Sequence, residues 1–499
     1  MKSKYIKGIT MENKLSAARK VVSAVALFVL VVAVGVFVVY NPAFNRSNVF
    51  VILTFFINIA LFVSQLLLSS TEHAFGFKVM FWTFNLFFFG LAPFYQYVSG
   101  SAIWGYKPTD REFLINNILV LAWSAMYIIG GTIQFGKKKR ALTPFTKEID
   151  KTKYKFVIRK NVLNAMLLIS LLIVVYYLVF VGFENMFYRE TSRNKELNGS
   201  TMLVLLEEHI LKNIVVFTFV IHVVEAKEKK FISAQLVLST ICLLITNFPT
   251  GLSRFAMAAV YAGIMIIVID KTRKGRWFVT VFILALVVVF PALDIFRNVD
   301  TFEAATNFWN SVKKEIESIY TTGDYDSYAM FINVRRYVNF FDYSYGYQLL
   351  GALFFFFPRS IWSTKPMGTG YTAFLALHPE FTNVSAPLIA EGYIDFGVLG
   401  VVIYALVIGA LTAWADKKYW SSNDPLSKER IVYPFLMMQF FFLLRGDLMS
   451  GIAFFAGKYA TGTLVYWMVI KKVLVNNENE TPEKPRLSKY IKVKNLKDK

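Results

Sequence analysis

The feature that most constrains this chain is a series of apolar blocks, each about 18 to 22 residues long, which is the length that spans a bilayer core. Only 17% of the 499 residues are charged and 56% are hydrophobic. Soluble domains carry roughly 25% charged residues and distribute them more evenly along the chain. We therefore expect an all-α polytopic membrane protein.

The apolar blocks predict about twelve transmembrane helices. The first block, 21–40, follows a basic segment at 1–20 but is too long for the apolar part of a cleavable signal, so it is interpreted as a membrane helix. The helices are expected at 21–40, 48–68, 79–98, 113–135, 162–182, 209–225, 233–248, 254–270, 277–296, 397–415, 431–448 and 452–470.

Basic residues gather in alternate connections between these blocks. Cytoplasmic loops of membrane proteins are enriched in Lys and Arg, so this alternation orients the helices and places both termini in the cytoplasm. The net charge of +21 follows from these connections and the tail at 471–499, and no nucleic acid is expected as a partner. The basic connections contain Lys137–Arg140, Lys227–Lys230, Lys271–Arg276 and Lys417–Lys418.

One connection is much longer than the others. Helices 1–9 are expected within 21–296 and helices 10–12 within 397–470, which leaves 297–396 as a large extracytoplasmic loop. Loops of this length in compact proteins usually carry function. Within it, helical spacing of apolar residues predicts an amphipathic helix over 301–320, and Leu349–Phe357 is too short to cross a membrane.

The first candidate site residue is Arg254, which follows a Pro- and Gly-containing turn at 247–253 and begins a predicted helix. The amino end of a helix beside an arginine favours anions. The structural alternative is a capped turn with an arginine that extends to the membrane surface.

A second candidate segment, Pro358–Pro366, places two cations around an aromatic residue in the large loop. Arg359 is suited to bidentate phosphate contacts, Lys365 to a point-charge contact, and Trp362 to stacking on a sugar. Trp, Arg and Lys are equally ordinary in the interfacial belt of a membrane protein, so that interpretation stays open.

Two further groups lie near predicted helix ends. Glu391 and Asp395 are four residues apart, which would put both carboxylates on one helix face. Glu391 is a candidate general base, whereas Asp395 is better explained by the preference of a helix start for acids. Arg445 ends an apolar run two residues before Asp447, its expected partner, and charges at this depth are usually paired or functional.

No cofactor or metal is expected. The four histidines lack the spacing of metal ligands, Cys242 is the only cysteine, and no phosphate-binding loop or dinucleotide motif occurs. The candidate chemistry therefore rests on arginines and carboxylates at one membrane face.

The order of these segments resembles the Wzy-type polymerases of O-antigen, capsule and related bacterial polysaccharides. The similarity is carried by Arg254 after its turn, PRSIWSTKP at 358–366, SAPLIAEGYIDFG at 385–397 and LLRGD at 443–447. Gly323–Asp326 (GDYD) also resembles an acidic element that these proteins carry early in the large loop. The topology agrees over nearly the whole chain.

The resemblance implies a glycosyltransferase at the outer face of the bacterial inner membrane. Its substrates would be undecaprenyl-pyrophosphate-linked repeat units within the membrane lipid, and a chain-length-regulating co-polymerase is a further partner to consider. Arg254, Arg359 and Arg445 would bind the pyrophosphate or the lipid carrier, with Lys365 as an additional cation. Glu391 would be the general base, with Asp326 as the alternative.

Two other functions remain open. An O-antigen ligase would share the loop, the arginines and the lipid-pyrophosphate donor but use a lipid A core acceptor. A lipid-linked oligosaccharide flippase or secondary transporter would also suit about twelve helices, but transporters tend to show internal repeats and charges near the midplane. This chain shows no repeat that we detect, and its polar candidates lie mostly at one membrane edge.

Overall fold

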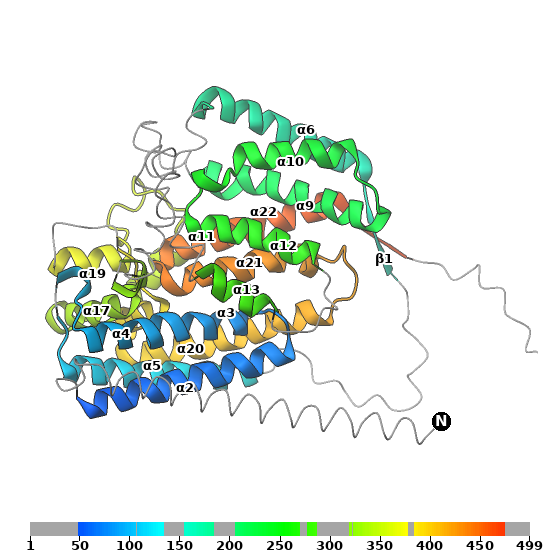
Figure 1. Cartoon of the computed structure of the whole chain (residues 1–499). Coiled ribbons are helices and arrows are strands. Elements are labelled where there is room, and N and C mark those ends of the chain that lie inside the picture. The colour runs from blue at the N-terminus through cyan, green and yellow to red at the C-terminus, as the bar shows by residue number, and fades with distance from the viewer. Residues whose placement is uncertain are drawn as a thin grey trace, which may run out of the picture.

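The computed structural model describes most of the chain as a bundle of long helices (Figure 1). The residues described are 48–105, 107–133, 154–183, 205–269, 277–286, 319–321, 323–377 and 384–474. The predicted helix at 21–40 and most of the predicted amphipathic helix at 301–320 lie outside these ranges.

Seven helical stretches in the described ranges are long and apolar enough to cross a membrane. Several are α-helices that continue into a π- or 3-10 turn, such as α6 (Lys160–Tyr176) followed by a π turn at Tyr177–Val181. The seven are α2 (Val49–Glu72), α3 to α4 (Phe77–Ser99), α5 (Asp110–Thr132), α6 and its π turn (Lys160–Phe180), the stretch ending in α9 (Glu207–Lys229), α10 with a 3-10 turn (Ala234–Gly251), and α20 (Leu388–Ser421). Within these stretches, α3 is Phe77–Phe84, α4 is Ala92–Ser99, α9 is Lys212–Lys229 and α10 is Ala234–Thr246.

Further helices and two strands complete the described structure. Two more long helices, α21 and α22, follow α20 directly. The remaining elements are α11 (Arg254–Met257), α12 (Gly263–Val268), α13 (Trp277–Leu284), α17 (Ser327–Phe341), α18 (Tyr347–Leu353), α19 (Thr369–Leu377), α21 (Lys428–Arg445), α22 (Leu448–Val469), β1 (Tyr154–Ile158) and β2 (Ile470–Leu474).

The helices pack around two hydrophobic cores. One core joins α2, α3, α4, α5, α17, α20 and α21 and is rich in buried phenylalanine. The other joins α6, α9, α10 and the parts of α21 and α22 near Ile431 and Val469. Figure 1 shows α21 and α22 in the middle of the bundle, with α20 and α5 on one side and α9, α10 and α6 on the other.

The outward surface of the long helices is apolar. Leu172 on α6, Leu399 on α20 and Trp467 on α22 are among many large hydrophobic side chains that are more than half exposed. Continuous apolar surface of this extent is unusual on a soluble monomer and suits contact with lipid. The prediction of a helical multi-pass membrane protein therefore agrees with the structure, whereas the count of twelve spans stays a prediction.

The observed helices follow the apolar blocks closely, with one informative difference. The helix expected at 397–415 is α20, which begins at Leu388 and ends at Ser421. Its backbone breaks at Phe396 and Gly397, where Gly397 adopts a φ of 62°. The turns before the break are helical because Ile389, Ile394 and their neighbours are buried in the core, so Glu391 lies on a helix rather than in the large loop.

The described part of the large loop packs onto the bundle. Tyr328 and Phe331 of α17 are fully buried, and α17 contacts α5, α19 and α20. The segment Leu349–Phe357, which is too short to span, is the end of α18 followed by a turn. We call the end of the bundle that carries α17 and α19 the site end.

The opposite end carries a two-stranded antiparallel ribbon, in which β1 pairs with β2 and Tyr154 lies opposite Leu474. This ribbon is not predicted from the sequence, because its two short strands are far apart in the chain and the second overlaps the basic segment expected as a tail from Lys471. The ribbon joins the connection before α6 to the end of α22, and we call this the ribbon end.

Candidate functional site

The centre of the candidate site is an ion pair between Arg254 and Asp324. Arg254 begins the helical stretch α11, which Ser253 caps by accepting a hydrogen bond from the Ala256 N–H at 3.3 Å. The guanidinium donates from Nη1 to Asp324 Oδ2 at 2.8 Å and from Nη2 to Asp324 Oδ1 at 2.7 Å. This two-point contact fixes the plane of the guanidinium group.

Arg445 reaches the same acidic segment from the end of α21. Its Nε donates to the Asp324 carbonyl at 2.9 Å, and its Nη2 donates to the Gly323 carbonyl at 3.0 Å. The guanidinium also lies over the Phe255 ring, 5.4 Å from its centroid. The two arginines predicted at separate helix ends are therefore brought together by Gly323 and Asp324.

Asp326 is the buried carboxylate of this group, with a side chain only 2% exposed. It lies 3.5 Å from Arg445 Nη2 and accepts hydrogen bonds from Trp104 Nε1 at 3.3 Å and Ser385 Oγ at 3.2 Å. Burial raises the pKa of Asp326 to about 6, although Arg445 and the two donors lower it in part. A carboxyl group with this pKa changes its protonation state near neutral pH.

Trp104 is a site residue that the sequence analysis missed. It lies in the short connection before α5 and has a φ of 63°, a left-handed conformation that is rare for a bulky residue. Its ring packs edge-on against Phe374 at 5.6 Å and touches Gly323, where an added Cβ would lie 3.0 Å from the indole. A strained backbone held by such contacts is a signal for a functional site, but it is visible only in the structure.

Glu391 lies at a second, enclosed point of the site end. Its side chain is 1% exposed and accepts hydrogen bonds from Thr369 Oγ1 at 2.5 Å and from the Leu448 N–H at 2.8 Å. These contacts tie the start of α20 to the starts of α19 and α22. Because both carboxylate oxygens accept hydrogen bonds from neighbouring elements, the contacts favour a positioning role, and the role of general base stays a prediction.

Asp395 and Asp447 make similar structural contacts. Asp395 accepts hydrogen bonds from Ser344 Oγ at 2.5 Å and Tyr404 OH at 2.7 Å, which hold α20 at its break. Asp447 caps α22 by accepting a hydrogen bond from the Met449 N–H at 3.0 Å. It packs so closely on Gly368 that an added Cβ there would lie 2.1 Å from its Oδ2. The pairing of Asp447 with Arg445, which the sequence suggested, is not among the contacts described.

The segment 358–366 forms a self-contained turn. Arg359 donates to the Lys365 carbonyl and, at 2.9 Å, to the Pro366 carbonyl. Lys365 is buried and donates to the carbonyls of Phe355 at 2.6 Å and Phe357 at 3.1 Å. Burial lowers the pKa of Lys365, and the nearby Arg359 adds to the effect.

Trp362, the aromatic residue of this turn, is half-buried against Tyr347, with the ring centroids 5.8 Å apart. The turn joins the rest of the site through Pro366, which packs on Gly351, and through the following residues up to Thr369. The structure therefore places Arg359 at the surface and Lys365 inside the turn.

The arrangement of two arginines beside a buried carboxylate could bind an anion and move a proton. In the described ranges, no group of three or more His, Cys, Asp or Glu residues could hold a metal. Two arginines and two aspartates instead meet within a few ångströms. Comparisons of the chain with known protein families, with curated proteins and with solved structures gave no match.

Proposed function

We propose that this protein polymerises polyprenyl-pyrophosphate-linked oligosaccharide repeat units into a surface polysaccharide. The site end would lie at the outer face of a bacterial inner membrane. The observation that carries the proposal is the meeting of Arg254 and Arg445 on Gly323 and Asp324, beside the buried Asp326. This cluster supports the proposal for two reasons. Cations stabilise the negative charge of a pyrophosphate leaving group, and a base accepts the proton of the attacking sugar hydroxyl.

The orientation is supported by the distribution of basic residues. The ends of α9 and α20 that are remote from the site carry Lys227, Lys229, Lys417 and Lys418. These belong to the basic connections that favour the cytoplasmic side. The opposite end, which carries Arg445 and Asp326, would then face the compartment in which surface glycans are assembled.

In the proposed reaction, the arginines bind the pyrophosphate of the donor. The guanidinium fork of Arg254 fits two phosphate oxygens as well as it fits the two oxygens of Asp324. Substrate binding would therefore exchange Asp324 for phosphate, which is feasible because the Asp324 side chain is 31% exposed. Arg445 would add positive charge from the other side, and the surface residue Arg359 would contact the glycan or the carrier headgroup.

The proton of the attacking sugar hydroxyl would go to Asp326. The new bond joins that hydroxyl oxygen to C1 of the donor sugar, and the bond from C1 to the pyrophosphate oxygen breaks with its electron pair. The pyrophosphate leaves on its lipid, stabilised by Arg254 and Arg445. Asp326 suits the role of base because its pKa is about 6 and because it lies 3.5 Å from Arg445.

Glu391 takes a different role in this proposal. Its two protein donors, Thr369 and the Leu448 N–H, occupy one oxygen each. It would hold α19 and α22 against α20, so that Arg445 at the end of α21 stays aligned. Trp362 and Lys365 would shape the turn that borders the glycan path.

The test is an assay with the purified full-length chain in lipid nanodiscs and synthetic polyprenyl-pyrophosphate-linked repeat units. The proposal predicts products with two or more repeats on one carrier and release of the free carrier pyrophosphate. Arg445→Gln should abolish both products, whereas Arg336→Gln, which breaks an ion pair with Glu112 elsewhere, should keep them.

Two outcomes would overturn the proposal. Transfer of the glycan only when a lipid A core acceptor is added would identify a ligase instead. Movement of the lipid-linked unit between leaflets without any new glycosidic bond would identify a flippase.

A further inference from the structure

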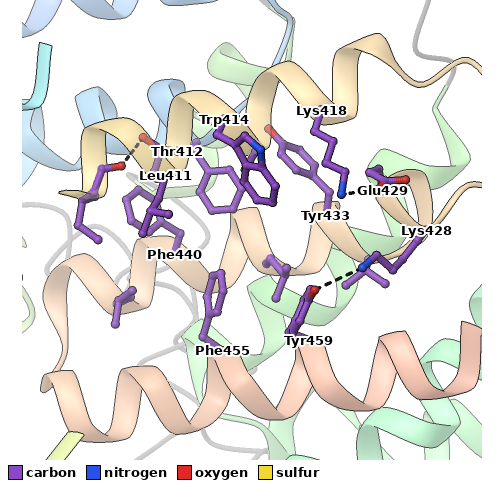
Figure 2. Close-up of a pocket in the computed structure, with 16 residues that line it drawn as sticks. Leu411, Thr412, Trp414, Lys418, Lys428, Glu429, Tyr433, Phe440, Phe455 and Tyr459 are labelled. Carbon is purple, nitrogen blue, oxygen red and sulfur yellow. Dashed lines mark hydrogen bonds and ion pairs between the residues drawn. The ribbon is translucent and has the colours of Figure 1, made fainter. Parts of the chain in front are cut away.

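A groove that begins at the ribbon end and runs along α21 has no role in the proposed chemistry. It is a cavity of about 360 Å³ between α20, α21 and α22, and Phe77 of α3 also lines it. Figure 2 shows apolar and aromatic side chains along its length. Its size falls in the range of cavities that hold ligands of a few hundred daltons.

The polar groups of the groove gather at one end. Lys418 Nζ lies 2.9 Å from Glu429 Oε1 and 5.1 Å from the centroid of the Trp414 ring. Lys428 Nζ donates to Tyr459 OH at 3.3 Å. Figure 2 shows these charged groups on one side of the view, with Leu411 and Phe440 on the other. Two cations and one carboxylate leave a net positive charge at this mouth.

The rest of the groove is long and apolar. Lys428 and Leu443 both line it and are 15 positions apart on α21. At 1.5 Å per residue, this separation is roughly 22 Å along the helix. Leu411, Trp414 and Tyr459 are nearly half exposed, so the groove opens on the outward surface that we assign to lipid. A slot with these dimensions accepts an extended hydrocarbon chain that enters from the side.

We propose that the groove binds one anionic phospholipid from the leaflet at the ribbon end. Its phosphate headgroup would lie between Lys418 and Lys428, and one acyl chain would run along Trp414 and Phe440 toward Leu443. The net positive charge at the mouth of the groove favours an anionic headgroup over a zwitterionic one. Each lysine close to an anionic membrane surface contributes about 1 kcal/mol of attraction.

The position of the lysines in the groove also distinguishes this lipid from the lipid-linked substrate proposed above. The headgroup site lies at the start of α21, and Arg445 lies at its other end. A carrier lipid bound by Arg445 would place its headgroup at the site end, where the groove is lined by apolar residues such as Leu443 and Phe440. The inference therefore does not depend on the polymerase proposal.

The test measures which lipids stay bound to the purified full-length chain. The protein would be incubated with equal amounts of phosphatidylglycerol and phosphatidylcholine that carry the same acyl chains. Native mass spectrometry would then compare how much of each lipid stays bound. We expect phosphatidylglycerol to be retained preferentially, and Lys418→Gln and Lys428→Gln each to lower that preference about fivefold. Lys417→Gln is the matched control, because Lys417 is exposed on the same turn but does not line the groove, and it should leave the preference unchanged.

Two further variants distinguish a loss of lipid binding from a loss of folding. Glu429→Gln removes the one carboxylate among the described residues that line the groove and should raise the preference for phosphatidylglycerol, a gain that a damaged fold would not produce. Ala415→Phe places a ring in the groove and should lower retention of both lipids. Equal retention of the two lipids, an equal loss in Lys417→Gln, or no effect of Glu429→Gln would overturn the proposal.

Discussion

Arg254 and Asp324 form a two-point ion pair, with N–O distances of 2.8 Å and 2.7 Å, between a helix start and the acidic segment before α17. The same aspartate uses its backbone carbonyl to accept a hydrogen bond from Arg445. One residue of the large loop thus holds two arginines from different helices. The pair explains how Arg254 and Arg445, which are 191 residues apart in the sequence, come together in one cluster.

The shape of Arg254, and not only its charge, should be needed for activity. Arg254→Lys keeps the positive charge but loses the planar fork that contacts two oxygens. We expect glycan transfer to fall by about 10- to 100-fold, the range for loss of one charge-stabilising donor. Arg336→Lys is the control, because Arg336 makes a similar two-point pair with Glu112 through Nε and Nη2. Equal losses in the two variants would contradict the assignment.

The rate of transfer should depend on pH through Asp326. Burial raises its pKa to about 6, so the carboxylate is available as a base above that pH and protonated below it. We expect the rate to be level above about pH 7 and to fall about tenfold per pH unit below 6. Asp326→Asn should lose activity at every pH. A rate that does not change between pH 5 and 8 would exclude Asp326 as the base.

Trp104 should set the pH at which Asp326 becomes active. Its indole N–H donates to the carboxylate, which stabilises the charged form and lowers the pKa of Asp326. Trp104→Phe keeps most of the ring packing but removes this donor, so the acid side of the pH–rate profile should move to higher pH. Trp420→Phe, which removes an indole donor to the Phe75 carbonyl at the ribbon end, should leave the profile in place.

Glu391 should behave as a positioning residue. Glu391→Ala leaves the Thr369 hydroxyl and the Leu448 N–H without their buried acceptor, at a cost of about 1–3 kcal/mol for each. Glu391→Gln keeps an acceptor oxygen and the same shape. We expect the Ala variant to melt earlier and lose activity, and the Gln variant to keep most of its activity. An inactive Gln variant with unchanged melting would assign the base to Glu391 instead.

Gly368 should tolerate no side chain. An added Cβ would lie 2.1 Å from Asp447 Oδ2, so Gly368→Ala would push away the residue that caps α22. We expect a loss of about 1–3 kcal/mol of stability, measured as an earlier melting transition in detergent. Gly131→Ala is the control, because the nearest atom there is 3.8 Å away and alanine favours the helix.

The sequence predicted the bundle better than the site. Apolar blocks locate helices because every turn that faces lipid or the core must be apolar, and α2, α5 and α22 follow their blocks within a few residues. The boundary of α20 was harder to predict. The sequence predicts a membrane helix that begins at Gly397, whereas hydrogen bonds from Thr369, Tyr404 and Ser344 allow Glu391 and Asp395 to be buried in the first turns of α20.

The site depends on contacts that no local pattern encodes. Residue type and helix ends pointed to Arg254 and Arg445, and the acidic motif pointed to Asp326. Trp104, which lies 222 residues from Asp326, carries no signal in the sequence because its importance comes from a left-handed backbone and one hydrogen bond. Lys365 looked like a free cation but is turned inward onto two backbone carbonyls.

The most direct test of the proposed function is made in the source cell. Surface glycan from a strain that lacks this chain would be separated on a gel, beside glycan from the same strain complemented with the wild-type chain or with Arg445→Gln. The account predicts that a ladder of many repeats collapses to a single repeat without the chain, returns with the wild type, and does not return with Arg445→Gln. An unchanged ladder in the deletion strain would contradict it.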